Sequence, residues 1–108
     1  MPSLNQNPTL SDFQQYVHEL EKERGFTDQN LLQKCLMLGE EVGELFKAIR
    51  KNENMKIDHK SKYSPIDEEL ADVLIFIFSI ANKCGIDLEQ AFRKKEEINK
   101  KRVWSKSQ

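Results

Sequence analysis

Two pairs of carboxylates, each with a spacing of three residues, are the residues of this sequence best suited to carry chemistry. The first pair is Glu41 and Glu44, preceded by Glu40, and the second is Glu69 and Asp72. A spacing of three residues places both members of a pair on one face of a helix. Because each pair borders an apolar stretch, we expect these acids to be partly buried, where like charges oppose ionisation unless a cation lies between them.

The chemistry of these side chains selects the kind of cation. Ligands that are all oxygen favour a hard ion, so we expect Mg²⁺, with Mn²⁺ as an alternative. A di-iron site needs Glu-x-x-His twice, and neither His18 nor His59 follows a glutamate by three residues. In a chain with 32% charged residues, one acidic pair is usually a solvated helix face. Two pairs, both in segments expected to form the core, leave two interpretations open from the pattern alone, a metal site and a solvated helix face.

Helices must position these acids, and the sequence predicts four of them. Each begins with a capping residue, and no segment shows the alternation typical of a strand. We expect an all-α fold, a four-helix-type bundle. The predicted helices begin at Thr9, at Asp28 or Asn30, at Ser64 with Pro65 at its first position, and at Asp87, and the first three end at Gly25, Asn52 and about Lys83.

The third predicted helix is apolar on every side between Val73 and Ala81. Such a helix must be central, and four short helices from one chain cannot easily cover it. We therefore expect a homodimer or a homotetramer built as a dimer of dimers. Gly39 and Gly43 lie inside the second helix at a cost of roughly 1 kcal/mol each relative to alanine, which indicates close helix packing or ligand access.

Composition and charge exclude several classes of function. The net charge of −1 favours neither nucleic acid nor an anionic membrane, and the longest apolar run, Val73–Ile80, is too short to span a bilayer. We expect a cytoplasmic protein with a single domain over residues 1–108. Cys35 and Cys84 lack metal or redox spacing and are expected to be reduced core residues. The polar segment 52–63 is a candidate lid.

The acids stand in two sequence contexts, Leu-Gly-Glu-Glu-Val-Gly-Glu-Leu and Glu-Glu-Leu-Ala-Asp-Val-Leu. These contexts resemble the E-E-x-x-E…E-x-x-D signature of the MazG-like all-α nucleotide pyrophosphohydrolases, relatives of the dimeric dUTPases and dCTP pyrophosphatases. The similarity continues through residues 82–89, and Lys95-x-x-x-Asn99-x-x-Arg102 resembles the K-x-x-x-N-x-x-R of the last helix in that family. It covers roughly residues 10–103.

The resemblance implies an activity and roles for the acids. Members of this family hydrolyse a nucleoside triphosphate to the monophosphate and pyrophosphate, so we expect an NTP or dNTP substrate, ordinary or damaged. By similarity, Glu41, Glu44, Glu69 and Asp72 are expected to bind Mg²⁺. Glu40, adjacent but rotated off that face, is a candidate for orienting or deprotonating the attacking water.

The resemblance also implies residues that bind the substrate. Lys95, Asn99 and Arg102 share one helix face and suit phosphate oxygens, although a solvated basic face has the same composition. Phe76, one turn after the second acid pair, is a candidate for stacking on the base, although most such phenylalanines are core residues. The aromatic and histidine positions that the family has before its second helix are only partly matched here, by Phe26 and Asn30.

A function of a different class is compatible with the same helical pattern. The alternative is a catalytically idle helical module that assembles with a partner or with copies of itself. Glutamates that face one another across adjacent helices have no evident purpose in such a module. Release of pyrophosphate from a panel of nucleoside triphosphates distinguishes the two.

Overall fold

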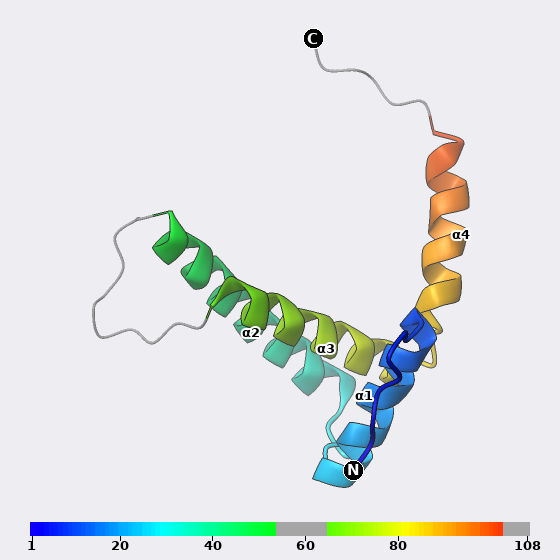
Figure 1. The fold of residues 1–108 in the computed structure, drawn as a ribbon, viewed down its shortest axis with the longest axis horizontal. Coiled ribbons are helices and arrows are strands. Elements are labelled where there is room, and N and C mark those ends of the chain that lie inside the picture. Colours follow the sequence, from blue (N-terminus) through cyan, green and yellow to red (C-terminus); the bar gives the residue numbers. More distant parts are fainter. Residues whose placement is uncertain (54–64, 103–108) are drawn as a thin grey trace.

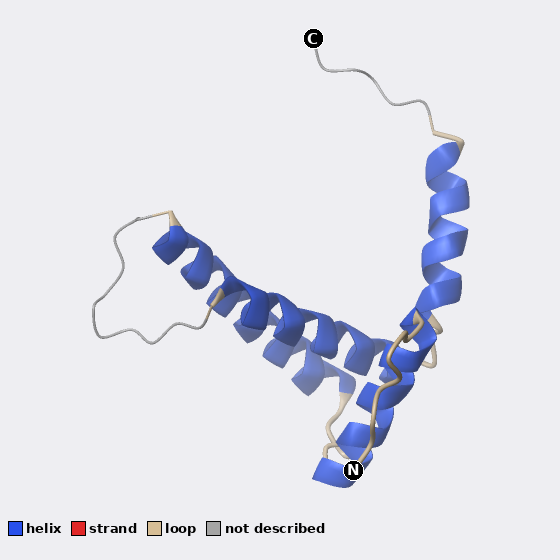
Figure 2. Cartoon of the chain, viewed as in Figure 1, coloured by secondary structure: helices blue, strands red, loops and turns tan. Residues whose placement is uncertain are grey.

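The chain folds into helices, with short connections at residues 25–30 and 85–87 (Figures 1 and 2). The computed structural model describes residues 1–53 and 65–102, and no strand occurs within these ranges, which confirms the all-α prediction. The segment expected to form a lid lies outside the described residues, apart from its first two positions. The helices are α1 (Leu10–Arg24), α2 (Leu31–Asn52), α3 (Ile66–Cys84) and α4 (Leu88–Lys100).

Reciprocal capping bonds start the first two helices. The Thr9 hydroxyl accepts a hydrogen bond from the Asp12 amide at 3.1 Å, and the Asp12 carboxylate accepts one from the Thr9 amide at 2.9 Å. Asn30 and Gln33 form the same arrangement at the start of α2, so Asn30 and not Asp28 is the N-cap. These bonds satisfy amides that have no partner within the first turn of a helix.

The start of α3 differs from the prediction by one residue. The helix begins at Ile66, with Pro65 in the N-cap position and no capping bond from a side chain, whereas Ser64 lies outside the described residues. Pro65 has a ψ of 152°, so its backbone is still extended. At the other end α3 runs to Cys84, and Gly85 closes it in the left-handed conformation with a φ of 68°.

The helices pack in a chain of pairwise contacts. α2 and α3 run antiparallel along each other, α1 crosses the C-terminal part of α3, and α4 contacts α1 (Figure 1). Buried Gln14 of α1 joins these parts: its amide donates to Asn82 Oδ1 at 2.9 Å and to the Ile86 carbonyl at 2.6 Å. The side-chain oxygen of Gln14, Oε1, accepts a hydrogen bond from the Leu88 backbone amide at 3.0 Å. Gln14 therefore fixes where α4 begins, together with the predicted N-cap Asp87.

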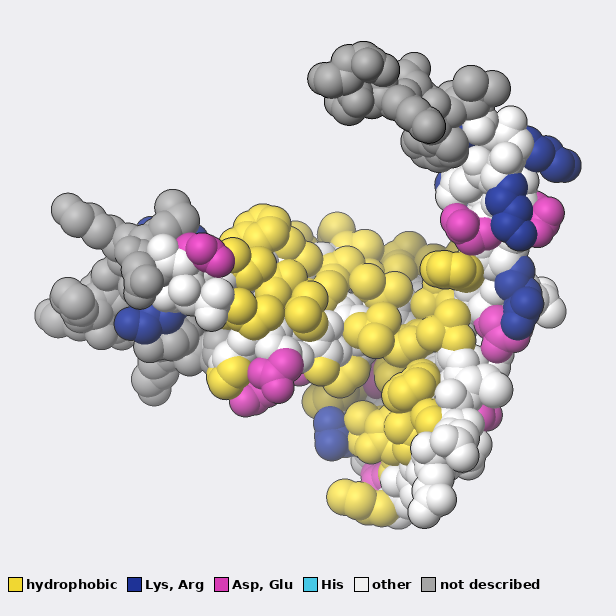
Figure 3. Space-filling model, turned by 45° about the horizontal axis from the view of Figure 1, so that its top comes forward, with side chains coloured by type: hydrophobic (Ala, Val, Ile, Leu, Met, Phe, Trp, Pro, Cys, Tyr) yellow, Lys and Arg dark blue, Asp and Glu magenta, His cyan; other side chains and the backbone are white. Residues whose placement is uncertain are grey.

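The apolar core of the single chain is small. Its buried apolar members are Val17, Ala48, Phe78 and Ala81, and the Phe78 ring stacks on Phe13 with centroids 6.3 Å apart. Large apolar side chains elsewhere on α2 and α3 remain exposed, and Figure 3 shows them covering a continuous face of the molecule. Every helix in the described part falls short of the length and apolar character that crossing a bilayer requires.

Two expectations about the core are corrected. The apolar pattern of residues 88–98 predicts that Phe92 and Ile98 of α4 face inward, but they are 66% and 51% exposed, because α4 packs mainly against α1 and not against the α2–α3 pair. Cys35 and Cys84 are free thiols as expected, but both are exposed and not core residues. Both observations describe surfaces that this single chain leaves uncovered.

Candidate functional site

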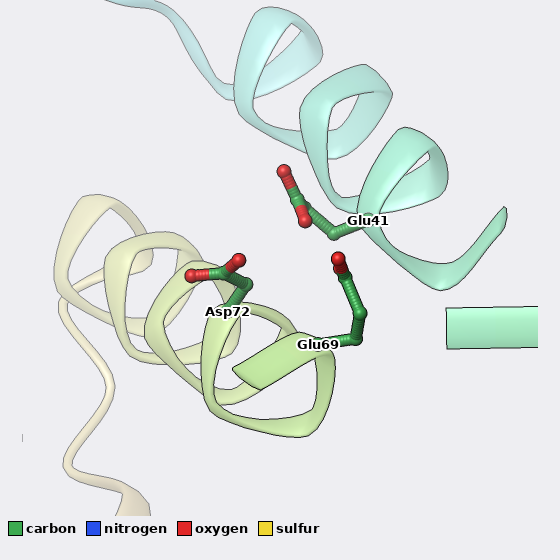
Figure 4. A group of neighbouring side chains, drawn as sticks. All are labelled: Glu41, Glu69 and Asp72. Carbon is green, nitrogen blue, oxygen red and sulfur yellow. The ribbon is translucent and has the colours of Figure 1, made fainter. Parts of the chain in front are cut away.

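The α2–α3 interface brings three of the predicted acids together. Glu41 of α2 and Glu69 and Asp72 of α3 each offer a carboxylate oxygen within 4.8 Å of the others. Figure 4 shows the three carboxylates directed into the space between the two helices. The spacing of three residues puts Glu69 and Asp72 on one face of α3, and the antiparallel packing of α2 brings Glu41 opposite them.

The three acids concentrate negative charge, and none of them forms an ion pair with a basic residue of the described ranges. Glu69 is only 3% exposed, and its Oε2 atom is buried without a hydrogen-bond partner in the described part of the chain. Burial raises the pKa of Glu41 above its ordinary value. The charges of Asp72 and Glu69, a hydrogen bond to Glu69 and the charge of Glu44 raise that pKa further.

A divalent cation fits this arrangement. The donors are all carboxylate oxygens, which hard ions such as Mg²⁺ prefer. An ion among them would satisfy the unpartnered oxygen of Glu69 and relieve the repulsion that acts on Glu41. When bound in such a site, a divalent ion neutralises phosphate charge and polarises phosphoryl oxygens.

The other two predicted acids lie outside this group. Glu44, one turn after Glu41 on α2, has a carboxylate 43% exposed and 3.8 Å from the Lys47 ammonium. It is still near enough for its charge to raise the pKa of Glu41. Glu40 is exposed on α2. The structure therefore separates a cluster of three acids, of which Glu69 is buried, from the neighbouring Glu40 and Glu44.

The predicted basic face lies on a different part of the molecule. Lys95 and Asn99 belong to α4, and Arg102 follows the end of that helix. The axis of α3 extends roughly 18 Å from Asp72 to Cys84. From the C-terminal end of α3, α4 extends away from the α2–α3 pair (Figure 1). Within one chain, the structure does not bring these three residues to the acids.

A cavity of about 200 Å³ opens beside the acids between α1, α2 and α3. Asp72 and Phe76 line it from α3, and Phe26 lines it from the loop that connects α1 and α2. The rest of its lining combines apolar side chains with polar ones, namely Val17, Leu20, Met37 and Ile75 with Glu21, Arg24, Gln29 and Ser79. Larger hollows lie along α4 and at the α3–α4 turn, but none of the clustered acids lines them.

Sequence reasoning missed a buried polar network next to this cavity. Lys34 of α2 is 3% exposed, forms an ion pair with Glu21 of α1, and donates to the Ser79 hydroxyl of α3 at 2.8 Å. A signal for it was present, because Lys34 lies three residues after Leu31 and four before Leu38, on the apolar face of α2. A charged residue at such a position needs a buried partner.

Comparison with known proteins is consistent with these features. The family model described as MazG nucleotide pyrophosphohydrolase domain matches residues 26–103. Human dCTP pyrophosphatase 1 is 34% identical over 93% of this chain and 62% of its own length. The dATP/dGTP diphosphohydrolase of cyanophage S-2L is 31% identical over 85% of this chain and 70% of its own.

A solved structure has the same fold. The crystal structure of iMazG from Vibrio DAT 722 superimposes with a TM-score of 0.62 and 33% identity, covering 85% of this chain and 94% of that one. The chain spans 59–62% of the length of the curated mammalian relatives it matches. The family match covers most of the chain and includes all the clustered acids. This chain therefore belongs to the family of MazG nucleotide pyrophosphohydrolase domains.

Proposed function

We propose that this chain is a Mg²⁺-dependent nucleoside triphosphate pyrophosphohydrolase that yields the nucleoside monophosphate and pyrophosphate. The observation that carries the proposal is the Glu41, Glu69 and Asp72 cluster with its unpartnered buried oxygen. Because relatives are named for dCTP, dATP and dGTP, we take deoxynucleoside triphosphates as the substrate class. Membership of the family supports the same reaction.

The acids then have distinct roles. Glu41, Glu69 and Asp72 hold the ion, and Glu44 joins them by giving up its contact with Lys47. An exposed ion pair of this kind contributes roughly 0–1 kcal/mol, so breaking it costs little. Glu40, which lies next to Glu41 but outside the cluster, orients or deprotonates the attacking water.

The cavity beside Asp72 is suited to the nucleobase. Phe76 and Phe26 offer aromatic faces on which a base can stack. Since Asp72 belongs both to this cavity and to the acid cluster, a nucleotide whose base occupies the cavity has its phosphates directed at the acids. Phe76 is therefore assigned to base binding.

A second copy of the chain is proposed to cover the exposed face of α2. Leu32, Leu36 and Phe46 are 68%, 65% and 60% exposed and share a helix face with Gly39 and Gly43. A Cβ atom at either glycine would meet nothing within 4 Å among the residues that the structure describes. The glycines therefore leave room for close approach of a partner helix, which accounts for their place inside α2.

The shape of the chain supports the same assembly. Its radius of gyration is 17.0 Å, whereas a compact domain of this length has about 13 Å. On α3, Leu70, Leu74 and Ile77 also form an exposed stripe. We propose a homodimer or a dimer of dimers in which α4 of one copy brings the Lys95, Asn99 and Arg102 face to the triphosphate bound by another.

The domain limits and location belong to this proposal as well. The family match begins at residue 26, but α1 is joined to α3 and α4 by Gln14, so residues 1–108 are proposed to act as one domain. The free thiols Cys35 and Cys84 are compatible with the reducing cytoplasm.

A panel of ribo- and deoxynucleoside triphosphates incubated with Mg²⁺ tests the function. We expect monophosphate and pyrophosphate in equal amounts from at least one substrate, and no turnover after chelation of the metal. A protein that hydrolyses none of them, or that releases diphosphate and phosphate, contradicts the proposal.

A further inference from the structure

The buried network of Lys34, Glu21 and Ser79 joins three helices. The Lys34 ammonium, 3% exposed, lies between the Glu21 carboxylate of α1 and the Ser79 hydroxyl of α3. An ion pair buried in this way rarely stabilises a protein more than apolar side chains of similar volume. Stability alone therefore does not account for charged side chains in the middle of this interface.

The network forms one end of the cavity assigned to the nucleobase. Glu21 and Ser79 line the same cavity as Phe76 and Asp72. Asp72, Phe76 and Ser79 follow one another at i, i+4 and i+7 on α3, so they share one face of the helix. Ser79 lies roughly 10 Å along that helix from Asp72. A nucleotide with its phosphates at Asp72 therefore presents the edge of its base to the network.

The chemistry of Glu21 determines what it can bind there. Lys34 engages Oε2 of Glu21, and the other oxygen, Oε1, makes no hydrogen bond within the described ranges of the chain. The Glu21 side chain is 15% exposed and lines this cavity together with a second one of about 210 Å³. An ionised carboxylate only accepts hydrogen bonds, so its partner must be a donor. Among the residues that line this cavity, Arg24 is the one that carries a positive charge.

We propose that Glu21, positioned by Lys34 and Ser79, determines base specificity by accepting a hydrogen bond from an exocyclic amino group. It selects cytosine or adenine over uracil or hypoxanthine, which carry a carbonyl oxygen in the same place. A carbonyl oxygen facing the carboxylate leaves two buried acceptors unpaired. This inference rests on the proposed function and names the substrates that the same site prefers.

Matched substrate pairs test the inference. The kcat/KM values are measured for dCTP against dUTP and for dATP against dITP. For wild type, we expect a preference of roughly tenfold or more for the amino-bearing member in at least one pair. Glu21→Gln reduces that preference, because the amide can turn its own N–H groups toward a carbonyl.

A double variant separates specificity from folding. Glu21→Leu combined with Lys34→Leu removes both charges, leaves no unpaired ion and is expected to keep or raise the melting temperature. Its preference should fall to about onefold while hydrolysis continues. Glu23→Gln is the matched control, since Glu23 is an exposed glutamate on α1 that lines none of these cavities, and its preference should equal that of wild type.

Binding of the products gives a second measurement. Calorimetry with dCMP, dUMP, dAMP and dIMP should show the same order of affinity in wild type and no order in the double variant. Equal handling of both members by wild type, or an unchanged preference in the double variant, overturns the inference and leaves the proposed function standing. If no triphosphate is hydrolysed, the proposed function fails, and monophosphate binding still decides the role of Glu21.

Discussion

The carboxylates of Glu41 and Glu69 face each other across the α2–α3 interface, and Oε2 of Glu69 is buried there without a hydrogen-bond partner among the described residues. Since like charges in this position oppose folding, a cation gives the arrangement its purpose.

Replacing Glu69 by glutamine should abolish turnover and leave the metal-free fold intact or more stable. We expect kcat to fall by roughly 100-fold or more, because an ion that contributes several kcal/mol to the transition state is lost. Thermal unfolding should show that Mg²⁺ raises the melting temperature of wild type but not of the variant. Glu68→Gln, at an exposed neighbouring position, is the control; an active Glu69→Gln protein contradicts the assignment.

In the metal-free protein, Glu41 should add to the free energy of unfolding at mildly acidic pH, beyond what the other acids contribute. The folded-state pKa of Glu41 is raised, so protonated Glu41 favours the folded state. This contribution is fully present below the ordinary glutamate pKa of about 4.3 and is lost as pH rises through the raised value. Urea unfolding of wild type and Glu41→Gln without metal, from acidic to neutral pH, measures it. Parallel pH profiles for the two proteins would exclude this effect.

Labelling with ¹⁸O water shows which phosphorus atom of the triphosphate the water attacks. Attack of water on the α-phosphorus forms a bond from the water oxygen to that phosphorus and expels pyrophosphate, so reaction in ¹⁸O water labels the monophosphate. Mass spectrometry of both products measures the label. Label in pyrophosphate alone would place the attack on the β-phosphorus and rule out the reaction as proposed.

Lys95→Ala should weaken handling of the triphosphate without affecting the metal. Removing one cation that contacts phosphate is expected to raise KM by roughly tenfold, in line with a charged hydrogen bond. The rise in melting temperature caused by Mg²⁺ should stay the same. Lys94→Ala is the control, because Lys94 is the neighbouring lysine on another face of α4. Equal KM and kcat values in the two variants would show that the face with Lys95 is solvated and does not bind phosphate.

Leu36→Glu should dissociate the proposed dimer. A charge in the exposed apolar stripe of α2 would be buried without a partner in the assembly, whereas in a monomer it stays solvated. Light scattering over a dilution series should show a shift to monomer, with activity falling in parallel. A monomeric wild-type protein with full activity refutes the assembly.

Much of the fold was predictable because its signals are local. Thr9 and Asp12, or Asn30 and Gln33, bond across three residues, so the sequence alone predicts where α1 begins and limits the start of α2 to Asp28 or Asn30. The spacing of Glu69 and Asp72 predicts a shared helix face for the same reason. The start of α3 was one residue off, since Pro65 occupies the N-cap position without a capping side chain.

Only the tertiary structure decided which distant residues meet. Glu41 lies opposite Glu69 and Asp72 while Glu44 stays at the surface, because the rotation of α2 against α3 depends on the packing of the whole interface. The same holds for Gln14 at the start of α4 and for the ion pair of Lys34 with Glu21. The periodicity of one helix shows which residues share a face, but the partner of that face is set by how the helices pack together.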